Sequence, residues 1–141
     1  MNDPSPAIRE YCTLHGFSKR VCDGGLEYLM HDWQRTVGDV VGGFTGLFDE
    51  YLNDMDGRRI IDELLPLAED TERRMVASSL PALDDGFLNA TLPTSSCIWG
   101  EDVAAKHNYI PGRDWWYYRI PSNLGRVEDP DAWPKVHPLE S

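Results

Sequence analysis

The sequence predicts a mainly α-helical fold: four or five helices in a compact, bundle-like domain, a small C-terminal β-hairpin and an irregular aromatic tail. Two observations lead to this prediction. Apolar residues recur at spacings of three and four through the first 92 residues, whereas prolines and tryptophans crowd the remainder. Because 141 residues is a usual length for one domain, we expect a helical body over 1–92, a hairpin with loops over 93–128 and an extended tail over 129–141.

Glycines and helix-capping residues mark the ends of the first two helices. The first begins at Ser5-Pro6, with Ser5 as the N-cap and Pro6 in the first helical position, and it ends at Gly16. The second begins at Ser18 or Asp23 and ends at Gly42-Gly43. It has the strongest apolar periodicity in the chain, carried by Leu26, Leu29, Met30, Trp33, Val37, Val40 and Val41.

Three shorter helices are expected before residue 92. Thr45 caps one that ends where Asp56-Gly57 makes a turn. The next is an apolar stripe that Pro66 ends, because the proline ring clashes with the preceding helical turn. The last runs from Thr71 to Leu80, where Pro81 closes or kinks it.

The C-terminal region favours short extended pieces. Ser96–Trp99 and Trp115–Ile120 are rich in aromatic and β-branched residues and are bounded by glycine or proline, so we expect both to be strands. They would pair as one hairpin over the helices, with a helical turn over Glu101–Asn108 between them. Trp133 would fix the following tail to the body.

The charge is strongly acidic: 13 Lys and Arg against 24 Asp and Glu give a formal net charge of −11. This charge argues against direct nucleic-acid binding, and no segment is apolar enough to predict a membrane span. Over 37–72 there are ten acids against Arg58 and Arg59. That region is either a solvated helical surface or a surface that attracts a basic protein, in part by mimicking nucleic-acid phosphate. Its candidate contact residues are Asp49, Glu50, Asp54, Asp62 and Glu63.

Aromatic residues are densest next to Arg119. As a strand, this segment would carry aromatic side chains on both faces, so it either closes the core, with Arg119 paired to an acid, or presents one face to a ligand or partner. A third alternative is a homodimer in which the strand meets its own copy. The candidate binding residues are Trp99, Trp115, Trp116, Tyr117, Tyr118 and Arg119.

The candidates for nucleophilic catalysis are Cys97 with His107 and either Asp102 or Asp114. Such chemistry requires the imidazole within hydrogen-bond reach of the sulfur and a third group that orients the ring. Ser95 or Ser96 with the same partners is the alternative, although no glycine-framed turn surrounds either serine.

No metal or cofactor is expected. Asp54, Asp56, Gly57 and Glu63 have part of the spacing of a calcium-binding loop, but its first position falls on Leu52 and its eighth on Arg59. Asp56 is better explained as the cap of the next helix. A second set supplies zinc-type ligands at spacings unlike those of a structural zinc site. That set is Cys12, His15, Cys22 and His31.

The predicted function is that of a small acidic cytoplasmic binding protein that acts on another protein, as immunity proteins and antitoxins do when they neutralise a basic toxin. Three cysteines at irregular spacing and a polar N-terminus favour the cytoplasm. The alternative is a small-ligand-binding domain or hydrolase-type enzyme, with a cleft between the helical body and the aromatic segment. Trp99, Trp115, Tyr117 and Arg119 would line that cleft.

Overall fold

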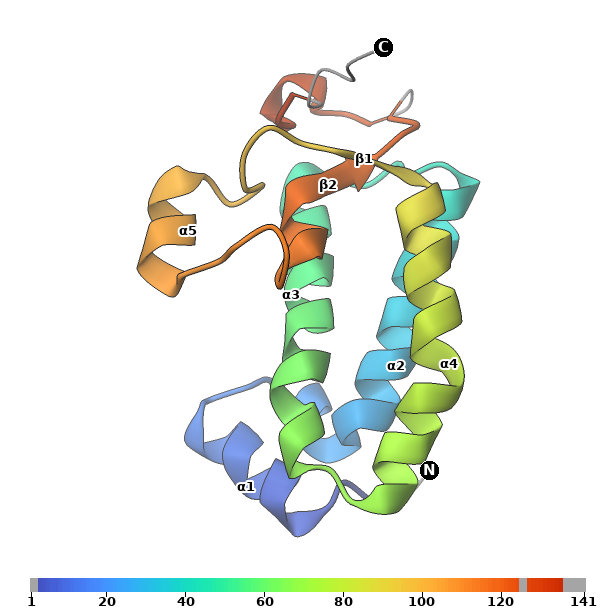
Figure 1. The fold of residues 1–141 in the computed structure, drawn as a ribbon, viewed down its shortest axis with the longest axis vertical. Helices are drawn as coiled ribbons and strands as arrows, with labels where there is room; N and C mark the ends of the chain where they lie inside the picture. Colours follow the sequence, from blue (N-terminus) through green and yellow to red (C-terminus); the bar gives the residue numbers. More distant parts are fainter. Residues whose placement is uncertain (1–2, 125–126, 136–141) are drawn as a thin grey trace.

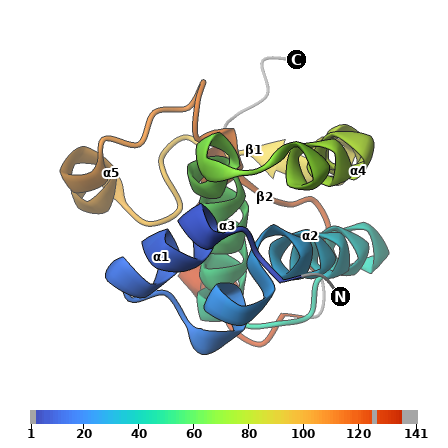
Figure 2. The same cartoon turned by 90° about the horizontal axis from the view of Figure 1, so that it is seen from below.

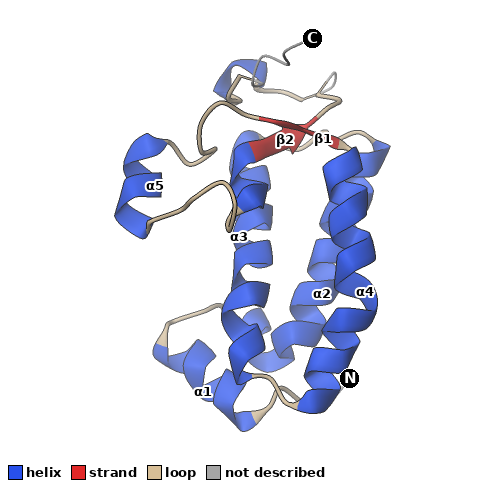
Figure 3. Ribbon diagram, in the orientation of Figure 1, coloured by secondary structure: helices blue, strands red, loops and turns tan. Residues whose placement is uncertain are grey.

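A computed structural model of the protein describes residues 3–124 and 127–135. The fold is mainly helical, as predicted: five helices pack together and a small two-stranded antiparallel sheet lies near the C-terminus (Figures 1 and 3). In the described ranges, no helix is both long enough and apolar enough to cross a membrane.

Three long helices form the body of the molecule. They are α2 (Lys19–Gly42), α3 (Phe48–Leu64) and α4 (Asp70–Asn89), which run in alternating directions along the long axis (Figure 1). Helix α2 packs against both of the others. The short helix α1 (Pro6–Leu14) lies across the end where α3 finishes (Figure 2), and α5 (Glu101–His107) stands to the side of α3.

The ends of the first two helices agree with the sequence. Pro6 begins α1, and Ser18 is the N-cap of α2, where its Oγ accepts a hydrogen bond from the backbone N–H of Val21 at 3.3 Å. Gly24 and Gly25 lie near the start of α2. Gly25 adopts φ 57° and ψ −141°, which interrupts the helix with a kink. Val41, expected inside, is 62% exposed.

The prediction of a turn at Asp56-Gly57 is wrong, because α3 continues through both residues to Leu64. The Asp56 carboxylate does not cap a helix. It accepts hydrogen bonds from Tyr117 Oη at 2.5 Å and Trp99 Nε1 at 3.1 Å. These tertiary contacts outweigh the helix-breaking preference of Gly57, which costs about 1 kcal/mol relative to alanine. The N-cap of α3 is Leu47, and not Thr45 as predicted.

Helix α4 continues past Pro81 to Asn89, where the sequence predicted a closure or kink. Pro81 is exposed, so its ring meets solvent on the outer side of the helix. Leu80 and Phe87, on either side of it, are both buried. Packing of those side chains holds the helix together in spite of the missing backbone N–H.

The predicted hairpin exists, but its strands are different. They are β1 (Thr91–Pro93) and β2 (Arg119–Pro121), with Leu92 opposite Ile120. The predicted strand Ser96–Trp99 is a loop with a turn, and Trp115–Tyr118 is a 3-10 helix, η2. Trp116 and Tyr117 are adjacent and both are buried, an arrangement that a strand with alternating faces does not give. The helical turn between the strands is confirmed as α5.

Among the described residues, Arg119 has no acidic partner. Its guanidinium donates to Thr91 Oγ1 at 2.7 Å, to the Thr91 carbonyl at 2.9 Å and to the Leu88 carbonyl at 3.3 Å. It thereby links β1 to the last turn of α4, where the Leu88 carbonyl has no partner within the helix. Burial lowers the pKa of Arg119.

Trp133 fixes the tail to the body, as predicted. It is buried and packs against Phe44, Phe48 and Tyr51, with ring centroids 4.9 to 5.6 Å apart. Asp129 anchors the same segment, because its carboxylate accepts from the backbone N–H of Phe48 at 3.1 Å and from Trp133 Nε1 at 3.2 Å. The rest of the predicted tail, 136–141, lies outside the described residues.

Candidate functional site

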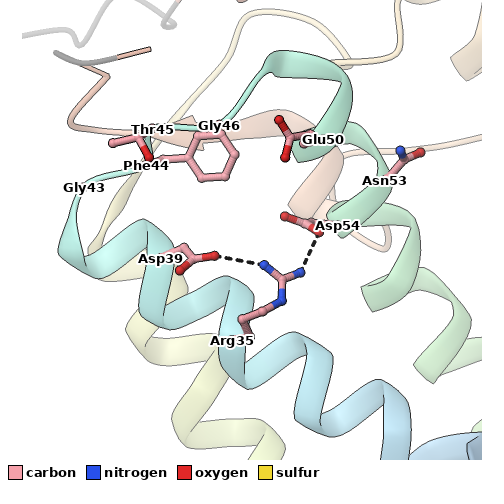
Figure 4. A pocket seen from close by; sticks show the side chains of 9 residues that line it. All are labelled: Arg35, Asp39, Gly43, Phe44, Thr45, Gly46, Glu50, Asn53 and Asp54. Atoms are coloured by element: carbon pink, nitrogen blue, oxygen red, sulfur yellow. Dashed lines mark hydrogen bonds and ion pairs between the residues drawn. The ribbon is translucent and has the colours of Figure 1, made fainter. Parts of the chain in front are cut away.

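A cavity of about 500 Å³ lies where the chain turns from α2 into α3 (Figure 4). Its lining comes from the last turns of α2, the connecting loop and the first turns of α3. We call it the acidic cavity; its residues are Arg35, Asp39, Gly43, Phe44, Thr45, Gly46, Glu50, Asn53 and Asp54.

The local sequence explains this arrangement. Gly43 ends α2 with φ 103°, a conformation that favours glycine, and the next residue, Phe44, turns inward onto Tyr51 and Trp133. A Cβ atom on Gly46 would lie 3.0 Å from the Phe44 ring, so a larger residue at position 46 would require a small shift of that ring. The loop therefore leaves an opening above Phe44 between the two helices.

Helical spacing places the polar side chains on facing surfaces. Arg35 and Asp39 are four residues apart on α2, and Glu50 and Asp54 are four residues apart on α3. Arg35 bridges the helices: its Nη1 donates to Asp39 at 2.9 Å and its Nη2 to Asp54 at 3.0 Å. Figure 4 shows this guanidinium between the two carboxylates.

Negative charge exceeds positive charge in the acidic cavity. Arg35 also donates to Asp32 at 3.0 Å, so a single guanidinium serves three carboxylates. Glu50 adds a fourth, whose Oε1 accepts from the backbone N–H of Leu47 at 3.0 Å. Within the described lining, Arg35 is the one cationic side chain. The cluster therefore favours a positively charged group.

Asp54 is the most buried carboxylate of the cavity, with 14% of its side chain exposed. Burial raises its pKa to about 6, against the lowering effect of Arg35, and the neighbouring Asp32 and Asp39 raise it further. For the half-exposed Arg35, hydrogen bonds to Asp32 and Asp54 outweigh burial and raise its pKa. For Asp54, desolvation outweighs the stabilisation that Arg35 gives to its ionised form.

A second cavity, of about 470 Å³, lies between α3 and the segment that follows α5. We call it the mixed-charge cavity; it is lined by Arg59, Asp62, Glu63, His107, Tyr109, Arg113, Asp114 and Trp116. His107 and Asp114, two of the residues considered for catalysis, both line this cavity.

The acidic residues proposed for partner binding do not share one surface. Glu50 and Asp54 line the acidic cavity, and Asp62 and Glu63 line the mixed-charge cavity, where they pair with arginines at 2.7 Å. Asp49 is exposed in the first turn of α3. Four of the ten acids over 37–72, Asp39, Asp54, Asp62 and Glu63, form ion pairs, so these four carboxylates already have a cationic partner within the protein.

The aromatic candidates mainly join parts of the fold. Trp115 packs on Phe87 of α4, and Tyr118 Oη donates to the Tyr109 carbonyl at 3.1 Å. Trp116 and Tyr117 are buried. Trp99 and Tyr117 both bond to Asp56, as described above, so these side chains tie the C-terminal segment to α3.

The catalytic candidates lie in separate surroundings. Cys97 is buried, burial raises the pKa of its thiol, and its side-chain partner is Tyr118. His107 stacks on Tyr109 with ring centroids 5.3 Å apart, and Asp102 is exposed on α5. The Asp114 carboxylate accepts from Arg113 and from the backbone N–H of Ile110. A hydrogen bond between Cys97 and His107 is not present in the described residues.

The carboxylates that resembled a calcium loop have separate partners: Asp54 pairs with Arg35, Asp56 with Tyr117 and Trp99, and Glu63 with Arg59. The zinc-type set is also dispersed, since His15 stacks on Tyr11 and His31 is exposed on α2. Across 3–124 and 127–135, no three His, Cys, Asp or Glu side chains are grouped to hold a metal ion.

Sequence reasoning missed Arg35, Asp39, Phe44 and Asn53 as site residues. The spacing of Arg35 and Asp39 was visible, but a pair four residues apart is common on helix surfaces. The pair contributes to a site only because α3 faces α2 and brings Asp54 within reach of Arg35, and the sequence does not show this packing.

Comparisons of the chain with protein-family models, with curated proteins and with solved structures find no match.

Proposed function

We propose that this protein binds a basic protein partner, and that the acidic cavity receives a lysine or arginine side chain of that partner. The observation that supports this function is the sharing of one guanidinium among three carboxylates at the α2–α3 turn, with Glu50 beside them. An incoming cation would compensate this excess of negative charge.

The shape and lining of the cavity suit a side chain. Its volume of about 500 Å³ falls in the range typical of ligand pockets. Phe44, which is 5% exposed, adds an apolar ring to the lining, and the carboxylates of Asp39, Glu50 and Asp54 supply hydrogen-bond acceptors for a cationic group.

The acidic cavity also has acidic surroundings. Asp49 precedes Glu50 on α3, and Asp129 bonds to the first turn of the same helix, which brings the neighbouring Asp131 to this end of the molecule. The net charge of −11 would speed the approach of a basic partner at low salt. Neutralisation of a basic toxin, as by an immunity protein or antitoxin, is the form of this function that we propose.

We place this function in the cytoplasm. Cys12, Cys22 and Cys97 all carry free thiols, which fits a reducing compartment.

The experiment is an affinity capture from the source cells with the full chain as bait, repeated with Asp39→Asn/Glu50→Gln. These substitutions remove two charges, and the amide oxygen that Glu50→Gln introduces can still accept from the Leu47 N–H. The proposal predicts a captured protein with net positive charge, recovered at least tenfold less with the double variant and less at high salt.

The matched control is Asp85→Asn/Glu101→Gln, which makes the same charge change at positions outside the cavity. Capture should survive this control. Equal recovery by wild type and the cavity variant, or recovery that is unchanged by salt, would overturn the proposed function.

A further inference from the structure

The mixed-charge cavity lies at the junction of α3 with the C-terminal segment. Arg59, Asp62 and Glu63 come from one side of α3, and Arg113 and Asp114 come from the loop between α5 and η2. In Figure 1 this loop runs from α5 back to α3. The cavity is distinct from the acidic cavity, because the two share no lining residue.

Every carboxylate of this cavity is paired with a guanidinium. Asp62 accepts from Arg58 at 2.7 Å, Glu63 from Arg59 at 2.7 Å and Asp114 from Arg113 at 2.9 Å. Arg58 lies outside the lining and is shared with Asp84, so Arg59 and Arg113 face three carboxylates and one negative charge remains in excess. Ion pairing therefore makes the lining less repulsive to an anion than unpaired carboxylates would be.

The arginines that line this cavity do not use all of their N–H groups in hydrogen bonds within the described residues. Arg59 uses Nε for Tyr117 and Nη1 for Glu63, and Arg113 uses Nε and Nη2 for Asp114 and Asn108. Among the described residues, this leaves Nη2 of Arg59 and Nη1 of Arg113 without a partner. The exposed imidazole of His107, which stacks on Tyr109, adds a further nitrogen donor at the same cavity.

A buried donor in the lining is also unpartnered. Trp116 is 1% exposed, and its Nε1 has no hydrogen-bond acceptor within the described part of the chain. Trp116 is a lining residue of the cavity, and buried polar atoms nearly always have a partner, so its isolated indole N–H calls for an acceptor. The indole is held in place by Arg58, whose guanidinium carbon lies 4.7 Å from the ring centroid.

We propose that the mixed-charge cavity binds a small ligand through an oxyanion group, a carboxylate or a phosphate. Arg113, Arg59 and His107 donate to the oxyanion, and Trp116 is the buried donor of the site. The stacked rings of His107 and Tyr109, with centroids 5.3 Å apart, form its aromatic wall, and Tyr109 stacks in turn on the buried Tyr117 at 4.5 Å. This ligand site goes beyond the proposed partner binding and does not depend on it.

The test is a titration of the full-length, ¹⁵N-labelled protein followed by the Trp116 indole N–H resonance, which Trp116→Phe assigns. The probes are acetate, inorganic phosphate and sodium chloride at equal ionic strength. A saturable shift with acetate identifies a carboxylate site, and one with phosphate identifies a phosphate site. Equal shifts with chloride, or no saturable shift with either oxyanion, would overturn the proposal.

Two variants separate binding from folding. Arg113→Gln should weaken oxyanion binding by about tenfold or more, because it removes a charged hydrogen-bond donor from the site. Arg74→Gln, the same change at an exposed position of α4, should leave it unaltered. If Arg113→Gln does not fold, His107→Gln, which changes an exposed side chain, takes its place as the test variant. Undiminished oxyanion binding by a folded Arg113→Gln or His107→Gln protein would contradict the site.

Discussion

Arg58 of α3 and Asp84 of α4 form the ion pair that joins the two helices flanking α2. The guanidinium is 4% exposed and donates to both carboxylate oxygens, at 3.0 and 2.8 Å. Trp33 of α2 donates to the same carboxylate at 3.0 Å, so one acidic side chain connects all three long helices.

Loss of this pair should strongly destabilise the fold. Removing one partner of a buried ion pair typically costs about 3–5 kcal/mol, because the other charge is left uncompensated. Arg58→Met should therefore lower the free energy of unfolding by about this amount in urea denaturation, and Arg58→Met/Asp84→Leu should recover part of it. The matched Arg74→Met, on the exposed face of α4, should change stability little. A loss below about 1 kcal/mol for Arg58→Met would contradict this assignment.

The sequence predicted the helical body but not this contact, for a physical reason. Apolar spacing reports which face of a helix is buried, and except for Val41 it located the α2 core. Arg58 carries a charge, so apolar spacing does not predict its burial. Its ion pairs with Asp84 and Asp62, and the packing of Trp33, Trp115 and Trp116 around its guanidinium, make the buried position favourable.

The kink in α2 should require Gly25. Its φ of 57° disfavours other residues, and a Cβ atom would lie 2.9 Å from two atoms of the Pro4 ring. Gly25→Ala should lower the unfolding free energy by about 1–3 kcal/mol, measured by thermal denaturation. The paired substitution Gly38→Ala, in the same helix with no atom near its added Cβ, should raise stability by about 0.5–1 kcal/mol. Equal effects of the two changes would contradict the kink.

The tail should contribute to stability through Trp133. Its ring is 7% exposed and contacts three aromatic rings of the body. Trp133→Ala should cost about 3 kcal/mol or more of unfolding free energy. Leu14→Ala, at a residue that is 75% exposed, should cost little. Denaturant midpoints of the two variants decide the matter, and similar midpoints would show that the tail does not stabilise the body.

Asp54 should make stability depend on pH. Its folded pKa of about 6 is above the ordinary value of 3.8, so the folded state holds this proton more tightly than the unfolded chain. The stabilisation is complete below pH 3.8 and is lost as the pH rises through 6. Asp54→Asn should therefore gain stability relative to wild type between pH 4 and 7, by about 3 kcal/mol at most. A stability difference that stays constant with pH, or that changes in the opposite direction, would contradict the raised pKa.

The candidate site was only partly predictable. Composition identified the acidic region, and Glu50 and Asp54 were among the residues chosen from it. Composition counts Arg58 and Arg59 only as charges. It does not reveal that each lies one helical turn from an acid, with which it forms an ion pair: Arg58 with Asp62 and Arg59 with Glu63. The aromatic segment Trp115–Ile120 is likewise predicted to be a strand, since tryptophan and tyrosine favour strands. Part of it is a 3-10 helix in which consecutive rings are buried, and such burial produces no regular spacing of apolar residues in the sequence.

The most direct measurement of the central claim is a titration of the ¹⁵N-labelled protein with N-acetyl-arginine amide and with its uncharged analogue N-acetyl-citrulline amide. The account predicts saturable shifts of the Asn53 side-chain amide and of the Gly43 and Gly46 backbone with the arginine compound alone. The Asp39→Asn/Glu50→Gln variant should weaken them at least tenfold. Equal responses to both compounds, or shifts that lie outside the acidic cavity, would contradict the claim that this cavity receives a basic side chain.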